Sequence, residues 1–230
     1  MTVSTEIKTM FENAVHIGHR TQKWNPKMKK FIYGEKDGIH VIDLERTSEC
    51  LETALNFLNK LFAEGKTVLF VSTKPQSARL LEDAAKECHM PYVSLKWIPG
   101  LLTNFGTIKT RTKYLGELKR QETAGEFDKY TKKEASGLKK EIAKLQVALG
   151  GVESMKAMPD AVFVIDTAGN SIVVKEARRM KVPIVGIVDT NADPSLVDYP
   201  IPANDDALKS LTYLLEKVCA VARKSGKIQK

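Results

Sequence analysis

Short apolar runs alternate with amphipathic stretches along most of the chain. Three runs rich in β-branched residues are typical of buried strands in a parallel sheet, namely 67–73, 161–166 and 184–189. Shorter runs at 92–95 and 39–44 predict a fourth and a fifth strand. Between the runs, apolar residues at spacings of three and four predict helices over 45–63, 75–88, 171–180 and 206–222. The alternation predicts an α/β fold with a doubly wound parallel sheet that helices cover on both faces.

Residues 104–150 interrupt this alternation, because they contain no strand-like run. A coiled-coil seam is indicated by the 4, 3, 4 spacing of Leu138, Ile142, Leu145 and Leu149. A compatible partner stripe consists of Phe105, Ile108, Thr112 and Leu115. We expect two antiparallel helices that project as a hairpin; the alternative is a helix pair packed back on the body. The predicted units are therefore a sheet domain with an N-terminal basic arm, 1–103 and 151–230, and a hairpin insertion, 104–150.

Charge is segregated along the chain. The 36 lysines and arginines exceed the 28 acidic residues, for a net charge of +8. Segments 16–36, 104–156 and 207–230 each carry a balance of +5, which leaves −7 on the remaining residues. Such an acidic body with basic segments is typical of a protein that binds a phosphate backbone. For any single segment, the alternative is a solvated lysine-rich face.

The composition argues against several other classes of protein. The three cysteines are widely spaced and form no CxxC pair, which argues against a disulfide framework or a zinc ribbon and favours a reducing compartment. No run approaches eighteen apolar residues, so we expect no membrane span. The first twenty residues lack the pattern of a signal or transit peptide. We therefore expect a soluble cytoplasmic protein without a membrane partner.

Carboxylates at predicted strand ends raise the alternative of an enzyme. Asp166 and Asp189 end two of the buried runs, as do acids that hold Mg²⁺ and phosphate in other α/β proteins. With Thr190 they define the alternative function, an α/β nucleotide- or Mg-dependent enzyme; their other reading is helix capping or loop fixing. The glycine-rich motifs GxGxxG and GxxxxGK[ST] are absent from the sequence. Their absence argues against the enzyme alternative, and we expect no cofactor.

The segment 16–36 combines imidazoles, an indole and cations. His16 and His19 have a spacing that can place both rings on one helical face, but neither a cysteine nor a paired acid is near in sequence to complete a metal site. We expect no metal there, and instead contacts to phosphates or bases, or simple packing. Trp24 offers either a stacking face for a base or a plug for the core. The composition predicts an RNA-contacting arm.

Long motifs, in order along the chain, resemble one family. They are HIGHRTQKWNPKM at 16–28, GIHVIDL at 38–44, WIPGLLTNFGTI at 97–108, PDAVFVIDT at 159–167 and the segment 176–207. The sequence resembles the universal ribosomal small-subunit protein two family, in its bacterial and organellar branch, from about residue 5 to about residue 225. Segments of this length are far more specific than the short patterns above.

The resemblance implies a fold and a function. Members have a flavodoxin-like parallel sheet with a protruding α-helical hairpin, and they are not enzymes. They bind small-subunit ribosomal RNA between head and body, join late in assembly, and contact neighbouring proteins of the small subunit. Where it is present, these neighbours include the first small-subunit protein, which recruits messenger RNA. The expected location is the ribosome, in the cytoplasm or in an organellar matrix.

With this resemblance, the basic residues divide into expected RNA contacts and residues whose role stays open. The expected RNA-binding residues are His16, His19, Arg20, Lys23, Trp24, Lys27, Lys29, Lys30, Lys109, Arg111 and Lys113. Cations farther along the hairpin either follow a groove of the RNA or are only solvated, namely Lys119, Arg120, Lys132, Lys133, Lys139 and Lys140. Contacts to phosphates would make binding depend on salt.

Overall fold

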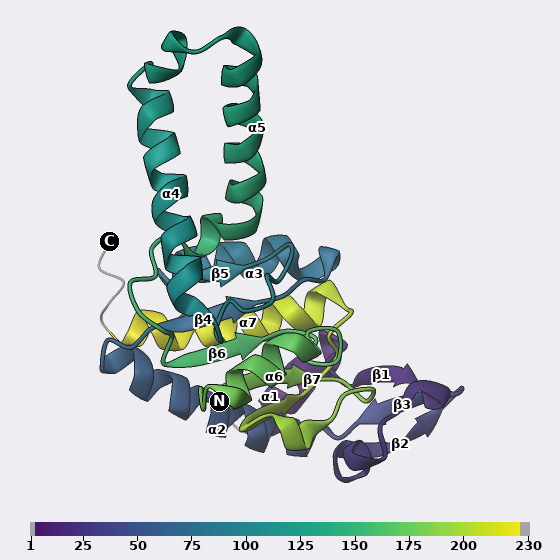
Figure 1. The fold of residues 1–230 in the computed structure, drawn as a ribbon. Coiled ribbons are helices and arrows are strands. Elements are labelled where there is room, and N and C mark those ends of the chain that lie inside the picture. The colour runs from purple at the N-terminus through teal and green to yellow at the C-terminus, as the bar shows by residue number, and fades with distance from the viewer. Residues whose placement is uncertain (1–2, 226–230) are drawn as a thin grey trace.

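The computed structural model describes residues 3–225 and contains two sheets (Figure 1). The larger sheet has five parallel strands in the order β5-β4-β6-β7-β8. Their bounds are β4 Val68–Val71, β5 Tyr92–Val93, β6 Ala161–Val164, β7 Ile184–Val188 and β8 Tyr199–Pro202. Four of these strands lie where the apolar runs predicted them, and the predicted parallel α/β sheet is confirmed.

The fifth strand differs from the prediction. The run at 39–44 gives β3 (Ile39–Ile42), which belongs to a separate antiparallel sheet with β1 (Ile17–Arg20) and β2 (Ile32–Lys36). Its expected place in the parallel sheet is taken by β8, which contains two prolines. Proline has no N–H to donate, so it is tolerated on an edge strand such as β8. Because proline is rare inside strands, the same two prolines make the sequence of β8 resemble that of a loop.

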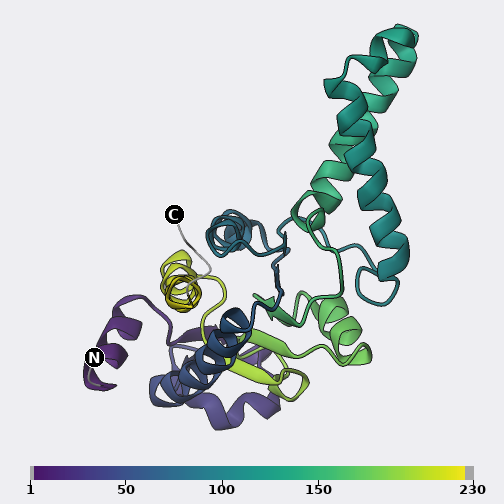
Figure 2. The same ribbon diagram turned by 90° about the vertical axis from the view of Figure 1, so that its left-hand side faces the viewer.

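Helices cover both faces of the parallel sheet (Figure 2). Alternation along β4 turns Val68 and Phe70 to one core and Leu69 and Val71 to the other. The first core is closed by α1 (Val3–Glu12), α2 (Leu44–Ala63), α3 (Pro75–Glu87) and α7 (Leu208–Lys224). The second core is closed by α6 (Ser171–Arg179) and the base of the hairpin. Among helices of the described residues, none is both long and apolar enough to cross a membrane.

The helical hairpin projects from the sheet in both views (Figures 1 and 2). It consists of α4 (Phe105–Thr123), the 3₁₀ turn η3 (Glu126–Lys129) and α5 (Lys132–Leu149), followed by η4 (Gly150–Val152). The seam predicted from the apolar spacing is confirmed, since residues of both stripes pack into one cluster. Thr131 and Glu134 form a capping box that starts α5. The division of the chain into two domains stays a prediction.

A buried glutamate on α6 holds the loop that leads into the hairpin. Oε1 of Glu176 accepts hydrogen bonds from the backbone N–H of Gly100 (2.7 Å) and from Nε1 of Trp97 (3.0 Å). Oε2 accepts from the backbone N–H of Leu102 (3.1 Å) and from the N–H and hydroxyl of Thr103 (3.2 Å each). The carboxylate thereby satisfies the turning backbone of residues 97–103, just before α4 begins.

The protonation of Glu176 follows from these contacts. Burial by itself raises the pKa of the carboxyl, but the hydrogen bonds from the loop outweigh burial and lower its pKa below the ordinary 4.5. The stability gained from this lowered pKa is therefore present above pH 4.5. It is lost as the pH falls through the lower pKa of the folded state.

We predict that Glu176→Gln lowers the free energy of unfolding by about 2–3 kcal/mol at neutral pH. The glutamine side chain keeps one oxygen acceptor but replaces the other with an NH₂ group, which cannot accept hydrogen bonds from N–H donors. The donors of residues 97–103 that face this NH₂ group therefore lose their partner while they stay in the folded loop. Urea unfolding followed by circular dichroism measures the change. The difference from the unsubstituted protein should narrow in acid, where Glu176 itself is protonated.

The matched control is Glu52→Gln, on the exposed face of α2. Its effect should stay within about 0.5 kcal/mol. Equal destabilisation by the two substitutions would contradict the anchoring role of Glu176.

Candidate nucleic-acid interface

The basic arm is a folded and anchored segment. Between β1 and β2 it forms the 3₁₀ turns η1 (Thr21–Lys23) and η2 (Pro26–Phe31). The loop after β7 fastens it at two points, because the N–H of Asn25 donates to the carbonyl of Thr190 (2.7 Å) and the N–H of His19 donates to its hydroxyl (2.8 Å). Met28 and Phe31 anchor η2 in the second core.

A glycine permits this close approach of the arm to the sheet. A Cβ added at Gly18 would lie 2.6 Å from Cγ2 of Thr190 and 3.0 Å from the carbonyl oxygen of His40. The first contact would force the Thr190 side chain to move, and the second is closer than most contacts between a Cβ and a backbone oxygen. A side chain larger than that of glycine at position 18 would therefore disturb the contact between the arm and the loop after β7.

The expected cations of the arm are exposed, but they differ in their pairing. This group comprises Arg20, Lys23, Lys27, Lys29 and Lys30. The ammonium of Lys27 lies 2.6 Å from Oδ2 of Asp193 and 3.0 Å from the hydroxyl of Ser195, so an internal acid partly neutralises it. Nζ of Lys30 lies 4.7 Å from the ring centroid of Phe31.

The two histidines lie in different surroundings, and the interpretation as one helical face is wrong. His19 is in strand β1, and His16 precedes it. The His16 ring stacks on Phe11, with centroids 4.2 Å apart, and burial lowers its pKa. The His19 ring lies 3.0 Å from Asp189, and its hydrogen bond to that carboxylate raises its pKa although burial opposes the shift.

Trp24 is partly available to a ligand. Its side chain is 38% exposed, and its ring centroid lies 5.2 Å from that of His40. It is therefore neither a core plug nor fully free, and one part of the indole can meet a base or a sugar.

The root of the hairpin carries the second set of expected contacts. Lys109, Arg111 and Lys113 are exposed in the second and third turns of α4. Nζ of Lys109 donates to the carbonyl of Lys156 (2.9 Å), which ties α4 to the chain that returns toward β6. Their assignment as RNA contacts stays a prediction.

Farther along the hairpin, some cations are paired with acids. Lys119 lies 2.6 Å from Glu153, and Arg120 makes a two-pronged contact with Glu117. Lys132, Lys133, Lys139 and Lys140 are exposed on α5. The hairpin therefore presents fewer free positive charges on α4 than its composition suggests.

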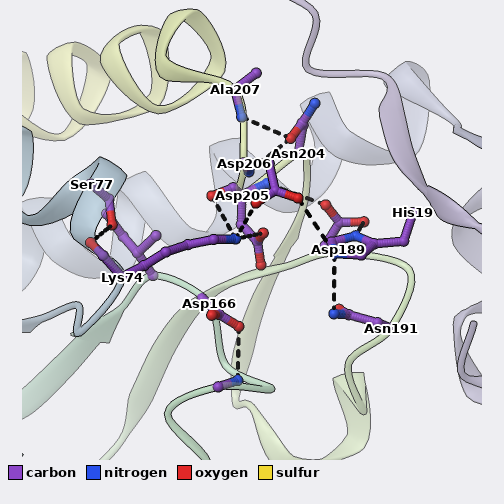
Figure 3. A network of polar contacts seen from close by, with 12 residues as sticks. His19, Lys74, Ser77, Asp166, Asp189, Asn191, Asn204, Asp205, Asp206 and Ala207 are labelled. Atoms are coloured by element: carbon purple, nitrogen blue, oxygen red, sulfur yellow. Dashed lines mark hydrogen bonds and ion pairs between the residues drawn. The ribbon is translucent and has the colours of Figure 1, made fainter. Parts of the chain in front are cut away.

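The carboxyl edge of the parallel sheet holds a network of charges that sequence spacing did not reveal (Figure 3). Lys74 follows β4, and its ammonium contacts Asp205 (2.7 Å) and Asp206 (2.5 Å) ahead of α7. The His19 ring bridges Asp189 (3.0 Å) and Asp206 (3.5 Å). Residues from four distant parts of the chain thus meet here, because the ends of parallel strands converge at one edge of the sheet.

Burial and mutual repulsion shape the protonation of this network. Asp205 is 1% exposed, and burial together with the nearby charge of Asp189 raises its pKa to about 7. The pKa of Lys74 is also raised, because the hydrogen-bonded carboxylates of Asp205 and Asp206 outweigh the opposing effect of burial. Lys74 therefore remains a cation at neutral pH and supplies the positive charge at the centre of the acids.

The strand-end acids of the enzyme alternative have structural partners. Asp166 has φ +57°, and its Oδ1 accepts a hydrogen bond from the N–H of Gly169 (2.8 Å), which fixes the turn into α6. Asp189 accepts from the N–H and hydroxyl of Thr190 and faces His19. These contacts agree with the loop-fixing reading of both acids.

Three side chains of this edge have the donor atoms to hold a cation. His19, Asp205 and Asp206 each offer one ligand atom, all within 4.8 Å of one another. Both aspartates also contact the ammonium of Lys74. His16 is not part of this group, because its ring stacks on Phe11. The two histidines that are near each other in sequence therefore do not share a site in the structure.

Comparison with known proteins identifies similar sequences along nearly the whole chain. The family model described as ribosomal protein S2 matches residues 10–225. A small ribosomal subunit protein uS2 of Campylobacter hominis is 47% identical over 212 residues, which are 92% of this chain and 79% of that protein. The uS2 protein of Dehalococcoides mccartyi is 44% identical over 94% of this chain and 88% of its own length. That of Campylobacter concisus is 45% identical over 96% and 84%.

We predict that Lys74→Met lowers the free energy of unfolding by about 3–5 kcal/mol near neutral pH, because it leaves the buried Asp205 without its cation. The loss should be larger at about pH 8 than at about pH 5, since protonation of Asp205 removes the unpaired charge. Denaturant unfolding at both pH values measures it.

Lys66→Met is the matched control, because Lys66 pairs with Asp160 at 3.4 Å on the surface. Its effect should remain below about 1 kcal/mol. A Lys74 variant as stable as this control would show that the network does not depend on the ammonium.

Proposed function

Because the chain belongs to the ribosomal protein S2 family, whose members are structural constituents of the small ribosomal subunit and not enzymes, we propose that it binds small-subunit RNA between head and body. The observation that carries the proposal is the anchored basic arm inside the matched residues 10–225. The family membership supports a place on the ribosome. Cytoplasmic location is our inference from the bacterial relatives.

The arm is suited to a phosphate backbone because its cations are presented by rigid turns. Lys23 ends η1, while Lys29 and Lys30 lie in η2, whose core side chains fix its position. A rigid display lowers the entropy lost on binding. The exposed part of Trp24 adds a surface for a base or sugar. We infer that the arm recognises the shape and the phosphates of folded RNA.

The hairpin supplies a second contact at a distance from the arm. The two features extend from different sides of the sheet domain (Figures 1 and 2). Its 19-residue helix α4 is about 28 Å long at 1.5 Å per residue, so it reaches well beyond the body. Lys109, Arg111 and Lys113 at its root would neutralise phosphates there. Two separated basic surfaces support a protein that bridges two parts of the RNA.

An apolar groove supports a protein neighbour on another surface. A groove of about 320 Å³ lies over the N-terminus of α2, between Phe11 and Tyr33. These rings are 60% and 81% exposed, and Asp43 and Glu45 add negative charge. This chemistry fits a segment with an apolar anchor and basic flanks. We infer that a neighbouring small-subunit protein docks there, and that it is the messenger-recruiting first protein where that is present.

We predict that joint substitution of Lys23, Lys29 and Lys30 by glutamate leaves the fold intact and abolishes stable incorporation into small subunits. For binding of the variant to purified small-subunit RNA, the logarithm of affinity is plotted against the logarithm of salt concentration. The slope should become shallower by about two to three units, since each lost phosphate contact removes about one unit. Filter binding over a salt series and sedimentation of tagged protein measure the two effects.

The matched control reverses three exposed lysines outside the basic segments, Lys8, Lys60 and Lys175. It produces the same change in net charge and should be incorporated nearly normally. Equal loss in both triple variants would indicate a net-charge effect and contradict the arm as a specific contact. Absence of binding by the unsubstituted protein would contradict the RNA-binding proposal itself.

We predict that Phe11→Ser combined with Tyr33→Ser leaves incorporation intact and removes a protein neighbour. Aromatic anchors often contribute about 2 kcal/mol or more to the free energy of binding, so occupancy of the first small-subunit protein should fall by about tenfold or more. Quantitative mass spectrometry of purified subunits measures it. Tyr130→Ser, an exposed tyrosine in the hairpin turn, is the control, and unchanged protein composition in the double variant would contradict docking at the groove.

A further inference from the structure

Two buried thiols lie side by side between α3 and α7. Sγ of Cys88 and Sγ of Cys219 are 3.5 Å apart, although the residues are 131 positions apart in sequence. Cys88 ends α3 as its C-cap and is 3% exposed, whereas Cys219 lies inside α7 and is 2% exposed. The two helices pack directly against each other, so this approach belongs to the first core.

A cavity borders the residue that carries one of these thiols. It has a volume of about 570 Å³ and opens at the amino ends of β4, β5 and β6, the edge opposite the Lys74 network. Cys88 lines it, together with Lys66, His89 and Asp160. A water molecule occupies about 30 Å³ in the liquid, so a small peroxide fits easily. The cavity therefore brings small solutes up to Cys88, although that residue is only 3% exposed.

We propose that Cys88 and Cys219 form a dithiol that a hydroperoxide, entering by this cavity, converts into an intramolecular disulfide. The sulfur of Cys88 attacks one oxygen of the peroxide, which gives a sulfenic acid and releases water when hydrogen peroxide is the oxidant. The sulfur of Cys219 then attacks the sulfur of Cys88, the S–S bond forms, and a second water leaves. Two thiols lose two electrons and two protons, and one peroxide is reduced to two waters.

The geometry requires a small movement. The sulfur atoms must close from 3.5 Å to about 2.05 Å, which side-chain rotation and slight adjustment of the helices can supply. The hydrogen bond from Cys88 to Cys219 and burial raise the pKa of the Cys88 thiol. Because the thiolate is the reactive form, oxidation is slow compared with that of an activated cysteine. The disulfide carries no charge, so the apolar surroundings do not oppose the product.

The crosslink would join helix α7 to the C-terminal end of helix α3. It closes a loop that contains β5, the hairpin and three further strands of the parallel sheet. Crosslinks around long loops restrict the unfolded chain most. The oxidised protein should therefore melt higher than the reduced protein, by about 5 °C or more.

The test uses the full chain, purified under reducing conditions and then treated with hydrogen peroxide. Intact-mass spectrometry should show a loss of two hydrogen atoms that dithiothreitol reverses, and peptide mapping should join the peptides of Cys88 and Cys219. Cys50→Ser should behave in the same way, because Cys50 is on α2 and is not part of the pair. Cys219→Ser should remove both the mass loss and the rise in melting temperature.

Several results would overturn the proposal. They are oxygen addition at Cys88 without a crosslink, a crosslink that involves Cys50, or disulfide-linked dimers as the main product. If Cys219→Ser does not fold, the peptide map of the oxidised unsubstituted protein decides alone, since it requires no variant. The test does not involve RNA, so its outcome is separate from that of the proposed ribosomal function.

Discussion

The carboxylate of Glu176, on helix α6 beside the parallel sheet, holds the loop that leads into the helical hairpin. A charge that burial disfavours is kept ionised by five donors from residues 97–103, and in return it fixes the backbone from which the hairpin departs. Unpartnered N–H groups in that loop would be costly inside the second core. The direction of α4, and with it the position of Lys109 and its neighbours, depends on this contact.

The carboxyl edge of the sheet shows how a fold associated with ligand binding serves a structural protein. In many open α/β sheets a ligand occupies the crevice at this edge. Here Lys74 provides the positive charge to which Asp205 and Asp206 are bound, and His19 brings the arm into the same network. Thr190 adds two hydrogen bonds to the arm. The edge therefore fixes the position of the arm, which is a structural role and agrees with a family of ribosomal structural proteins.

Pairing within the protein changes the meaning of the charge pattern. Lys27, Lys119 and Arg120 contribute to the basic balance of their segments, yet each contacts an acid of the same chain. Lys23, Lys29 and Lys30 project from rigid turns with exposed side chains. The electrostatic argument for RNA thus rests on fewer residues than the net charge suggests, and they lie on the anchored arm and at the root of the hairpin.

The sequence by itself determined the parallel sheet, the hairpin seam and the family resemblance, because each depends on local periodicity or on long motifs. Only the tertiary structure decided that β8, with its two prolines, is the edge strand and that β3 pairs elsewhere, since strand pairing depends on distant partners. It also decided the surroundings of the two histidines that are close in sequence. His16 stacks on Phe11, whereas His19 contacts Asp189. The meeting of Lys74 with Asp205 has no signal in spacing. It arises because parallel strands bring their ends together at one edge, whatever their separation in sequence.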